Sequence, residues 1–145
     1  MTTADGLVTI LLVEDDDGDF IALQRAFTKA KLPHPIRRAL DGIEALDILR
    51  GTNGAKKIKK PFLLVSDVNM PRLNGIKLVQ QMRNDSELSD SIIFIYTTSN
   101  LPKDKSESYD ENVAGYILKG SAAGGNFEKL AEVLGVYCRD VEMPA

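Results

Sequence analysis

Residues 63–75 read LLVSDVNMPRLNG, and this stretch decides how the rest of the chain is interpreted. Its first residues are apolar and branched, which is typical of a buried strand. The apolar run ends at Asp67, and a proline and an Asn-Gly pair then mark a loop and a turn. Because open α/β sheets place their sites at the carboxyl ends of strands, we expect Asp67 to belong to a functional site.

Apolar strands and helices alternate along the whole chain. The expected strands are 7–13, 35–40, 61–67, 92–96 and 113–118. Apolar residues at helical spacing predict helices at about 20–30, 43–50, 76–82 and 127–138. A further helix at 102–112 begins at a proline, which suits a first turn, but it is almost wholly polar and should bury little. This alternation predicts a parallel sheet that is covered on both faces and has right-handed crossovers.

The length, net charge and cysteine count of the sequence limit the classes of function. A length of 145 residues predicts one domain, with a core at about 7–138 and a C-terminal tail at 139–145. The net charge of −3 gives no reason to expect binding to nucleic acid or to a membrane surface. A single cysteine excludes an internal disulfide and favours the cytoplasm. The first residues lack the features of a signal peptide, and no apolar run is long enough to span a membrane.

Polar side chains follow or end four of the expected strands. They are Glu14 and Asp15 after the first, Asp67 at the third, Thr97 at the fourth and Lys119 after the fifth. These ends meet at one edge of a parallel sheet, where two carboxylates ~4 Å apart repel each other by about 1 kcal/mol in water and about 4 kcal/mol at an effective dielectric of 20. A hard cation such as Mg²⁺ resolves this conflict, and Lys119 adds a compact positive charge.

This set of side chains suits the transfer of a phosphoryl group onto a carboxylate. Asp67 can attack phosphorus and form an acyl phosphate. The metal ion and Lys119 would neutralise charge on the transferred oxygens, and the Thr97 hydroxyl can donate a hydrogen bond to one of them.

Several of these polar residues also have simpler interpretations. Asp16, Asp17 and Asp19 are best explained as residues that cap the first helix and interact with its dipole. Tyr116 is a core residue by default. The residues at the strand ends could be ordinary turn, cap and surface residues. However, the different strand ends supply groups that suit one common site, namely carboxylates, a hydroxyl and an ammonium, and this favours a functional role.

Four motifs make the chain similar to a known family. They are LLVEDD at 11–16, DVNMP at 67–71 with Gly75, YTT at 96–98, and GYILK at 115–119. In this order and spacing they resemble the receiver domain of two-component response regulators over nearly the whole chain. The resemblance implies an α/β, flavodoxin-like (βα)5 fold with a doubly wound five-stranded parallel sheet of order 2-1-3-4-5.

The resemblance also implies roles for the acidic residues. Asp67 matches the phosphoacceptor. Glu14 and Asp15 match the acidic pair that holds Mg²⁺ together with Asp67, and Asn69 matches the residue whose backbone carbonyl also contacts the metal.

Further roles follow for the remaining matched residues. Thr97 and Lys119 match the partners of the phosphoryl oxygens. Tyr116 matches the aromatic residue whose rotation accompanies the inward movement of Thr97 on activation. Asn69 and Ser99 occupy positions where side chains tune the loss of the phosphoryl group.

One branch of the family is more similar than the others. Gly120 stands where the family usually has a proline after a cis bond, and a cis bond before a non-proline residue costs about 2.5–4 kcal/mol, so the resemblance does not carry the cis geometry over and the sequence leaves it open. This departure, the loop before 61–67 and the tail after Tyr137 are similar to single-domain regulators that partner phytochrome histidine kinases. Such regulators tend to dimerise through the helix at 102–112, the strand at 113–118, the helix at 127–138 and the tail.

We therefore interpret the chain as a stand-alone response regulator that accepts a phosphoryl group from a sensor histidine kinase and changes a protein-interaction surface. The last expected helix leaves no room after it for an output domain, so the output should be a protein contact or onward transfer. On this interpretation it is no enzyme beyond its own phosphorylation and dephosphorylation. One alternative is a constitutive interaction module with an unused acidic pocket. Another is a metal-dependent phosphohydrolase, against which Asn69 counts because it replaces a second acid.

Overall fold

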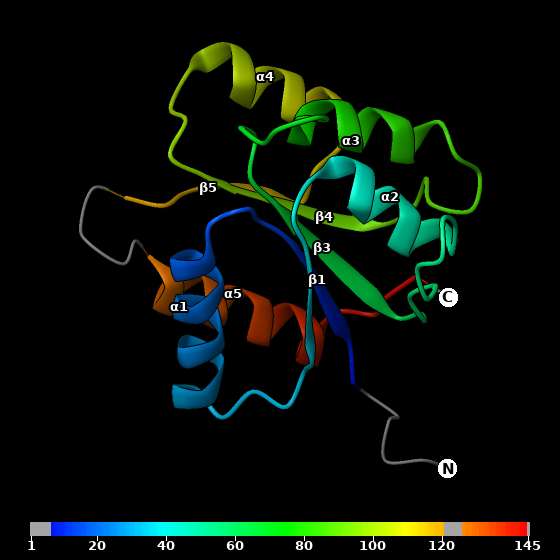
Figure 1. Ribbon diagram of the computed structural model, residues 1–145. Helices are drawn as coiled ribbons and strands as arrows, with labels where there is room; N and C mark the ends of the chain where they lie inside the picture. The colour runs from blue at the N-terminus through cyan, green and yellow to red at the C-terminus, as the bar shows by residue number, and fades with distance from the viewer. Residues whose placement is uncertain (1–6, 121–125, 145) are drawn as a thin grey trace.

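The computed structural model describes residues 7–120 and 126–144 of the chain (Figure 1). The strands in this part are β1 Thr9–Val13, β2 Ile36–Ala39, β3 Phe62–Ser66, β4 Ile92–Thr97 and β5 Gly115–Leu118. The helices are α1 Asp17–Lys29, α2 Gly42–Arg50, α3 Gly75–Arg83, α4 Pro102–Asp110 and α5 Phe127–Asp140. Every strand and helix expected from the sequence is present, with small differences at the ends.

The strands form one parallel sheet in the order β2-β1-β3-β4-β5, which confirms the predicted topology. Helices α2, α3 and α4 cover one face, and α1 and α5 cover the other (Figure 1). Each face has its own apolar cluster, so that Leu11 and Leu64 belong to one cluster whereas Ile10 and Leu63 belong to the other. Strand β3 is buried along its whole length, as expected for the centre of a parallel sheet.

The strands that carry the predicted site end at the same edge of the sheet. The register pairs Val13 with Ser66 across β1 and β3, and Thr97 with Leu118 across β4 and β5. The polar residues that follow these strands are therefore brought together by backbone pairing, before any contact among their side chains is considered.

Helix α4 buries little, and hydrogen bonds hold the chain that follows it. Among the residues of α4, all of which the structure describes, Ser108 alone is buried, so the prediction that this helix would bury little is confirmed. The helix ends at Asp110, earlier than the predicted residue 112. Arg83 of α3 then donates to the backbone carbonyls of Glu111 and Asn112 at 2.8 and 3.1 Å. These bonds anchor the chain between α4 and β5 to α3.

The helices are too short to cross a bilayer. The longest one in the described part of the chain, α5, has 14 residues, whereas a span needs about 20 apolar residues. Within residues 7–120 and 126–144, no helix is long and apolar enough to be a membrane span.

The loop after Asp67 depends on Gly75, the first residue of α3. A Cβ atom at Gly75 would overlap the backbone carbonyl oxygen of Asp67. The Gly75 amide also donates to the carbonyl of Val68 at 2.9 Å. The backbone of Asp67 and the start of α3 are therefore packed in direct contact, and a side chain at Gly75 has no space.

We expect Gly75→Ala to lower the free energy of unfolding by about 3 kcal/mol, because the added methyl group must displace the backbone that carries Asp67. Gly54→Ala is the matched control: Gly54 has a φ of 83°, but an added Cβ there meets nothing within 4 Å. The control should cost only the backbone strain, about 1–2 kcal/mol. Urea unfolding followed by circular dichroism measures both values. Equal losses in the two variants would contradict the packing role of Gly75.

Candidate functional site

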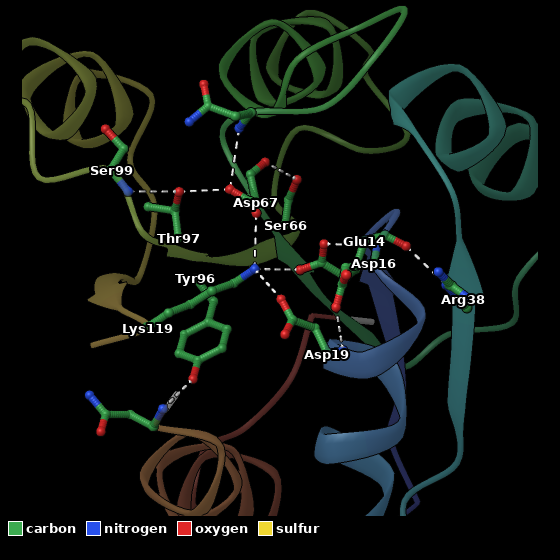
Figure 2. Close-up of polar contacts among 12 residues, drawn as sticks. Glu14, Asp16, Asp19, Arg38, Ser66, Asp67, Tyr96, Thr97, Ser99 and Lys119 are labelled. Atoms are coloured by element: carbon green, nitrogen blue, oxygen red, sulfur yellow. Dashed lines mark hydrogen bonds and ion pairs between the residues drawn. The ribbon is translucent and has the colours of Figure 1, made fainter. Parts of the chain in front are cut away.

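Lys119, which follows β5, lies at the centre of a polar cluster at the carboxyl edge of the sheet (Figure 2). Its ammonium donates to Glu14 Oε1 at 2.6 Å, to Asp19 Oδ2 at 2.7 Å and to Asp67 Oδ2 at 3.0 Å. The side chains of Lys119, Glu14 and Asp67 are 8%, 5% and 11% exposed, so these ion pairs are largely shielded from water. An ammonium group has three donors, and here each has a carboxylate partner. One cation thus offsets the mutual repulsion of three acidic side chains.

Both carboxylate oxygens of Asp67 accept hydrogen bonds. Oδ1 accepts from the Thr97 hydroxyl at 2.6 Å and from the backbone N–H of Asn69 at 3.2 Å, while Oδ2 accepts from Lys119. Donors from β4, from the β3–α3 loop and from the end of β5 therefore converge on the predicted phosphoacceptor. Asn69 itself is exposed. Thr97 is fully buried, and its hydroxyl is directed at the Asp67 carboxylate.

Burial and pairing together set the charges of this cluster. Burial raises the pKa of Glu14 to about 7, although the hydrogen bond and charge of Lys119 act in the opposite direction. Burial alone would lower the pKa of Lys119, but its hydrogen bonds to Asp19 and Glu14 and the charge of Asp67 outweigh that effect and raise it. The site thus holds a permanent cation beside a carboxyl group that gains or loses a proton near neutral pH.

The turn between β1 and α1 is fixed by polar contacts on both of its sides. Asp16 is the N-cap of α1 and accepts from the backbone N–H of Asp19 at 2.8 Å, which confirms its predicted capping role. Asp17 lies in the first turn, but its side chain binds Arg38 Nη1 at 2.6 Å. Arg38 Nε in turn donates to the backbone carbonyl of Glu14 at 2.9 Å. Arg38 therefore ties β2 to the turn that carries Glu14.

Asp19 is a site residue that the sequence interpretation missed. We predicted that it caps the helix, but its carboxylate binds Lys119 instead. A signal for this contact was present, because side chains in a helix lean toward its N-terminus and the N-terminus of α1 lies at the carboxyl edge of the sheet. The sequence did not show that Lys119 would lie within reach.

The metal ligands that the resemblance implies come together only in part, because Glu14 and Asp67 meet at Lys119 and Asp15 does not. Asp15 is exposed and lies outside the Lys119 cluster. In the part of the chain that the structure describes, no three acidic, histidine or cysteine side chains form a group that could hold a metal ion. Glu14 and Asp67 are both bound to the Lys119 ammonium. The predicted donors, including the backbone carbonyl of Asn69, are nevertheless all oxygens, which is the chemistry that Mg²⁺ prefers.

A chain of hydrogen bonds connects Asp67 to Tyr116. The N–H of Ser99 donates to Thr97 Oγ1 at 3.2 Å, and the Ser99 carbonyl accepts from the Tyr116 hydroxyl at 2.8 Å. The Ser99 hydroxyl also donates to Asp104 of α4 at 2.6 Å. Tyr116 is half-buried and packs against the apolar cluster under α2 and α3, and this burial raises its pKa. The structure thus brings four predicted residues, Asp67, Thr97, Ser99 and Tyr116, into one network that reaches α4 and β5.

Gly120 adopts a conformation that suits glycine. In the described part of the chain the cis bond is Lys60–Pro61, so the bond between Lys119 and Gly120, whose geometry the sequence left open, is not cis. Gly120 has a φ of 82°, in the left-handed region that glycine enters without steric cost. A proline, whose ring fixes φ near −65°, could not adopt the conformation seen at Gly120.

Sequence comparison finds similarity to signalling receivers. The sequence model of the response regulator receiver domain matches residues 10–131. The chain is 24% identical to the response regulator Rcp1 of Synechocystis over 136 residues, which cover 94% of this chain and 92% of that protein. It is 31% identical to a chemotaxis protein CheY homolog of Campylobacter jejuni over 126 residues, which cover 86% of this chain and 92% of that protein.

Solved structures of similar proteins have the same fold. The phosphorylated cyanobacterial phytochrome response regulator RcpA aligns with a TM-score of 0.85 at 26% identity, over 96% of this chain and 99% of that one. RPA3017, a response regulator in red light signalling of R. palustris, aligns with a TM-score of 0.82 at 27% identity, over 96% and 99% of the two chains. Similarity thus extends over nearly the full length of both proteins.

We expect Lys119→Met to lower the free energy of unfolding by about 3 kcal/mol at pH 8, because it leaves buried carboxylates without their cation. The loss should be smaller at pH 5. The pKa of Glu14 is raised in the folded protein, so proton uptake as the pH falls favours the folded state and relieves the repulsion. Urea unfolding in EDTA at both pH values measures the difference.

The control for this prediction is Lys29→Met, which removes the exposed ion pair between Lys29 and Glu128. It should change stability little at either pH, because water screens an exposed pair. A loss in Lys119→Met that is the same at pH 5 and pH 8 would contradict the electrostatic account of the cluster.

Proposed function

The chain belongs to the response regulator receiver domain family of two-component signalling, and from this premise we propose that Asp67 accepts a phosphoryl group from a sensor histidine kinase. The observation that carries the proposal is the convergence of the Thr97 hydroxyl, the Asn69 N–H and the Lys119 ammonium on the Asp67 carboxylate. These donors lie where negative charge would collect on a phosphoryl group attached to Asp67, and their positions are fixed in advance by the sheet.

In the proposed reaction an oxygen of Asp67 forms a bond to phosphorus while the bond from phosphorus to the kinase imidazole breaks. The imidazole keeps the electron pair, and the product is a mixed anhydride of carboxylic and phosphoric acid. Lys119 and Thr97 donate hydrogen bonds to the transferred oxygens. Water later hydrolyses the anhydride, and the side chains of Asn69 and Ser99 tune this loss. The chain catalyses these two steps on itself and acts on no other substrate.

Mg²⁺ is the cofactor in this proposal. The carboxylates of Glu14, Asp15 and Asp67 and the backbone carbonyl of Asn69 would hold it, and it would supply positive charge next to the transferred oxygens. The all-oxygen donor set supports this assignment. Because Glu14 and Asp67 both bind Lys119 in the structure, we expect the cation and the ammonium to share these two carboxylates.

The output in this proposal is a change in a protein-interaction surface. A phosphoryl group that takes the Thr97 hydroxyl as its donor would change the hydrogen bonds that continue through Ser99 to Tyr116. Ser99 precedes α4, and Tyr116 lies in β5. The change is a shift between two populations of this network, which alters how α4, β5 and α5 bind a partner.

The surface of α4, β5 and α5 also supports a homodimer as part of the proposal. These elements and the residue before α4 expose the apolar side chains Leu101, Tyr109, Leu118, Val133 and Val136. Val133 and Val136 are neighbours on α5, three residues apart, and exposed apolar groups that lie together are typical of interaction sites. The dimer would use this face together with the C-terminal tail.

A phytochrome-type histidine kinase is the proposed phosphoryl donor. The similarity to RcpA and to the bacteriophytochrome response regulator RtBRR supports this partner. Nucleic acid and lipid are no part of the proposal, and the cytoplasm remains the expected compartment.

Incubation with Mg²⁺ and acetyl phosphate should add the mass of one phosphate to the wild-type protein. Asp67→Asn should gain none, because the amide is not a nucleophile toward phosphorus, and EDTA should prevent the gain in the wild type. Intact-protein mass spectrometry measures the result. Asp110→Asn, which changes an exposed acid at the end of α4, is the matched control and should be labelled like the wild type.

If Asp67→Asn gained the mass of one phosphate as fully as the wild type, the assignment of Asp67 as the phosphoacceptor would be wrong. If neither acetyl phosphate nor a phosphorylated histidine kinase labels the wild type, the constitutive interaction module becomes the better explanation of the same surface.

Sedimentation velocity at micromolar concentration should detect a dimer in the wild type. Val136→Lys should shift the protein to monomer, since it places a charge among the exposed apolar side chains of α5. Ile21→Lys is the control, because Ile21 is equally exposed but lies on α1, outside the proposed face. A wild-type monomer before and after phosphorylation would remove the dimer from the proposal.

A further inference from the structure

Asp19 binds the ammonium group of Lys119, but none of the roles proposed for phosphoryl transfer accounts for this contact. Its carboxylate lies 2.7 Å from the Lys119 ammonium, closer than the 3.0 Å that separates Lys119 from Asp67. Asp19 and Asp67 approach the ammonium from different sides (Figure 2). Asp19 has no place in the acceptor and metal-binding set, so its contact with Lys119 needs its own account.

The three donors of Lys119 are all in use. One goes to Glu14, one to Asp19 and one to Asp67. When Asp67 becomes an acyl phosphate, the oxygen bonded to phosphorus is a poorer acceptor, and new charged oxygens stand beside it. Lys119 can turn the donor released by Asp67 toward them, but the other two donors remain bound to carboxylates. Any closer approach of the ammonium to the phosphoryl group has to stretch those two bonds.

Of these two restraints, Asp19 is the one whose side chain can be removed cleanly. Its backbone N–H is held by the N-cap Asp16, so the start of α1 does not depend on the Asp19 carboxylate. The Asp19 side chain is 29% exposed, and a truncated side chain leaves a gap that water can fill. Asp17, two residues earlier in the same turn, binds Arg38 instead and offers a matched comparison of equal charge.

We propose that Asp19 is a positioning residue that holds the Lys119 ammonium back from Asp67 and so limits how tightly the site binds a phosphoryl group. This inference rests on the proposed function and adds a restraint to it. Asp19 touches neither the acceptor nor the transferred group, and it acts through Lys119. A charge-assisted hydrogen bond of this kind is stronger than one between neutral groups, so its loss should be measurable.

The test measures the affinity of the full chain for beryllium fluoride in the presence of Mg²⁺, because beryllium fluoride mimics a phosphoryl group on a carboxylate. Asp19→Ala should bind it about three- to tenfold more tightly than the wild type in calorimetric titration. Asp19→Asn keeps an acceptor oxygen but loses the charge, and should lie between the two. Asp17→Ala should bind like the wild type. Thermal unfolding of each variant confirms that it is folded.

A second readout needs no metal. With ¹⁵N-labelled lysine, the protons of the Lys119 ammonium should exchange slowly with water in the wild type because three carboxylates bind them. Asp19→Ala should exchange them several-fold faster, and Asp17→Ala should not. In a Lys119→Met background, the Asp19→Ala change should no longer affect the affinity for beryllium fluoride, because the residue through which it acts is absent.

The outcomes separate this inference from the function on which it rests. If the wild type binds beryllium fluoride and Asp19→Ala binds it no more tightly, the restraint is disproved while the receiver chemistry stands. An equal gain in Asp17→Ala, or a gain that persists without Lys119, would reveal a general effect of acidic charge and overturn the inference. If the wild type does not bind beryllium fluoride at all, the proposed function itself fails, and the inference fails with it.

Discussion

One buried ammonium group surrounded by three carboxylates is the interaction on which the rest of this site depends. Lys119 comes from the end of β5, Glu14 from the end of β1, Asp67 from the end of β3 and Asp19 from α1. Three buried or half-buried acids would repel one another and take up protons if the cation were absent. The cluster therefore forms only when these four elements lie in their native positions. The ion pairs of the site thus depend on the folding of the sheet.

Contacts that take no part in the chemistry keep this cluster in place. The Asp67 backbone packs directly against Gly75, so the start of α3 fixes the loop after β3. Arg38 of β2 binds the backbone carbonyl of Glu14 and fixes the turn after β1. A strained or loosened loop at either point would move a carboxylate away from Lys119. The site is thus precise because rigid backbone contacts surround it, and its polar side chains occupy positions that the sheet has already set.

The fold and much of the site could be predicted from the sequence for a simple reason. Apolar runs separated by helices specify a parallel sheet, and in a parallel sheet the carboxyl ends of the strands meet at one edge. Glu14, Asp67, Thr97 and Lys119 each follow or end such a run, so their proximity follows from topology. Tyr116 was predicted as a core residue by default and, from the resemblance, as the aromatic residue that rotates with Thr97. In the structure its half-buried ring packs against the core and its hydroxyl donates to the Ser99 carbonyl.

The sequence by itself determined the parallel sheet, its functional edge and the side chains delivered there, because these depend on local patterns and on the rule that parallel strands end together, while the strand order followed from the resemblance to the receiver family. Only the tertiary structure decided which partner each charge takes. Asp16, Asp17 and Asp19 are alike in sequence, yet one caps α1, one binds Arg38 and one binds Lys119. Asp15, the neighbour of Glu14, is exposed and takes no part in the Lys119 cluster. Hydrogen bonds and ion pairs require atoms to lie about 3 Å apart. The sequence pattern is compatible with several slightly different rotations of α1, and each rotation would give these aspartates different partners.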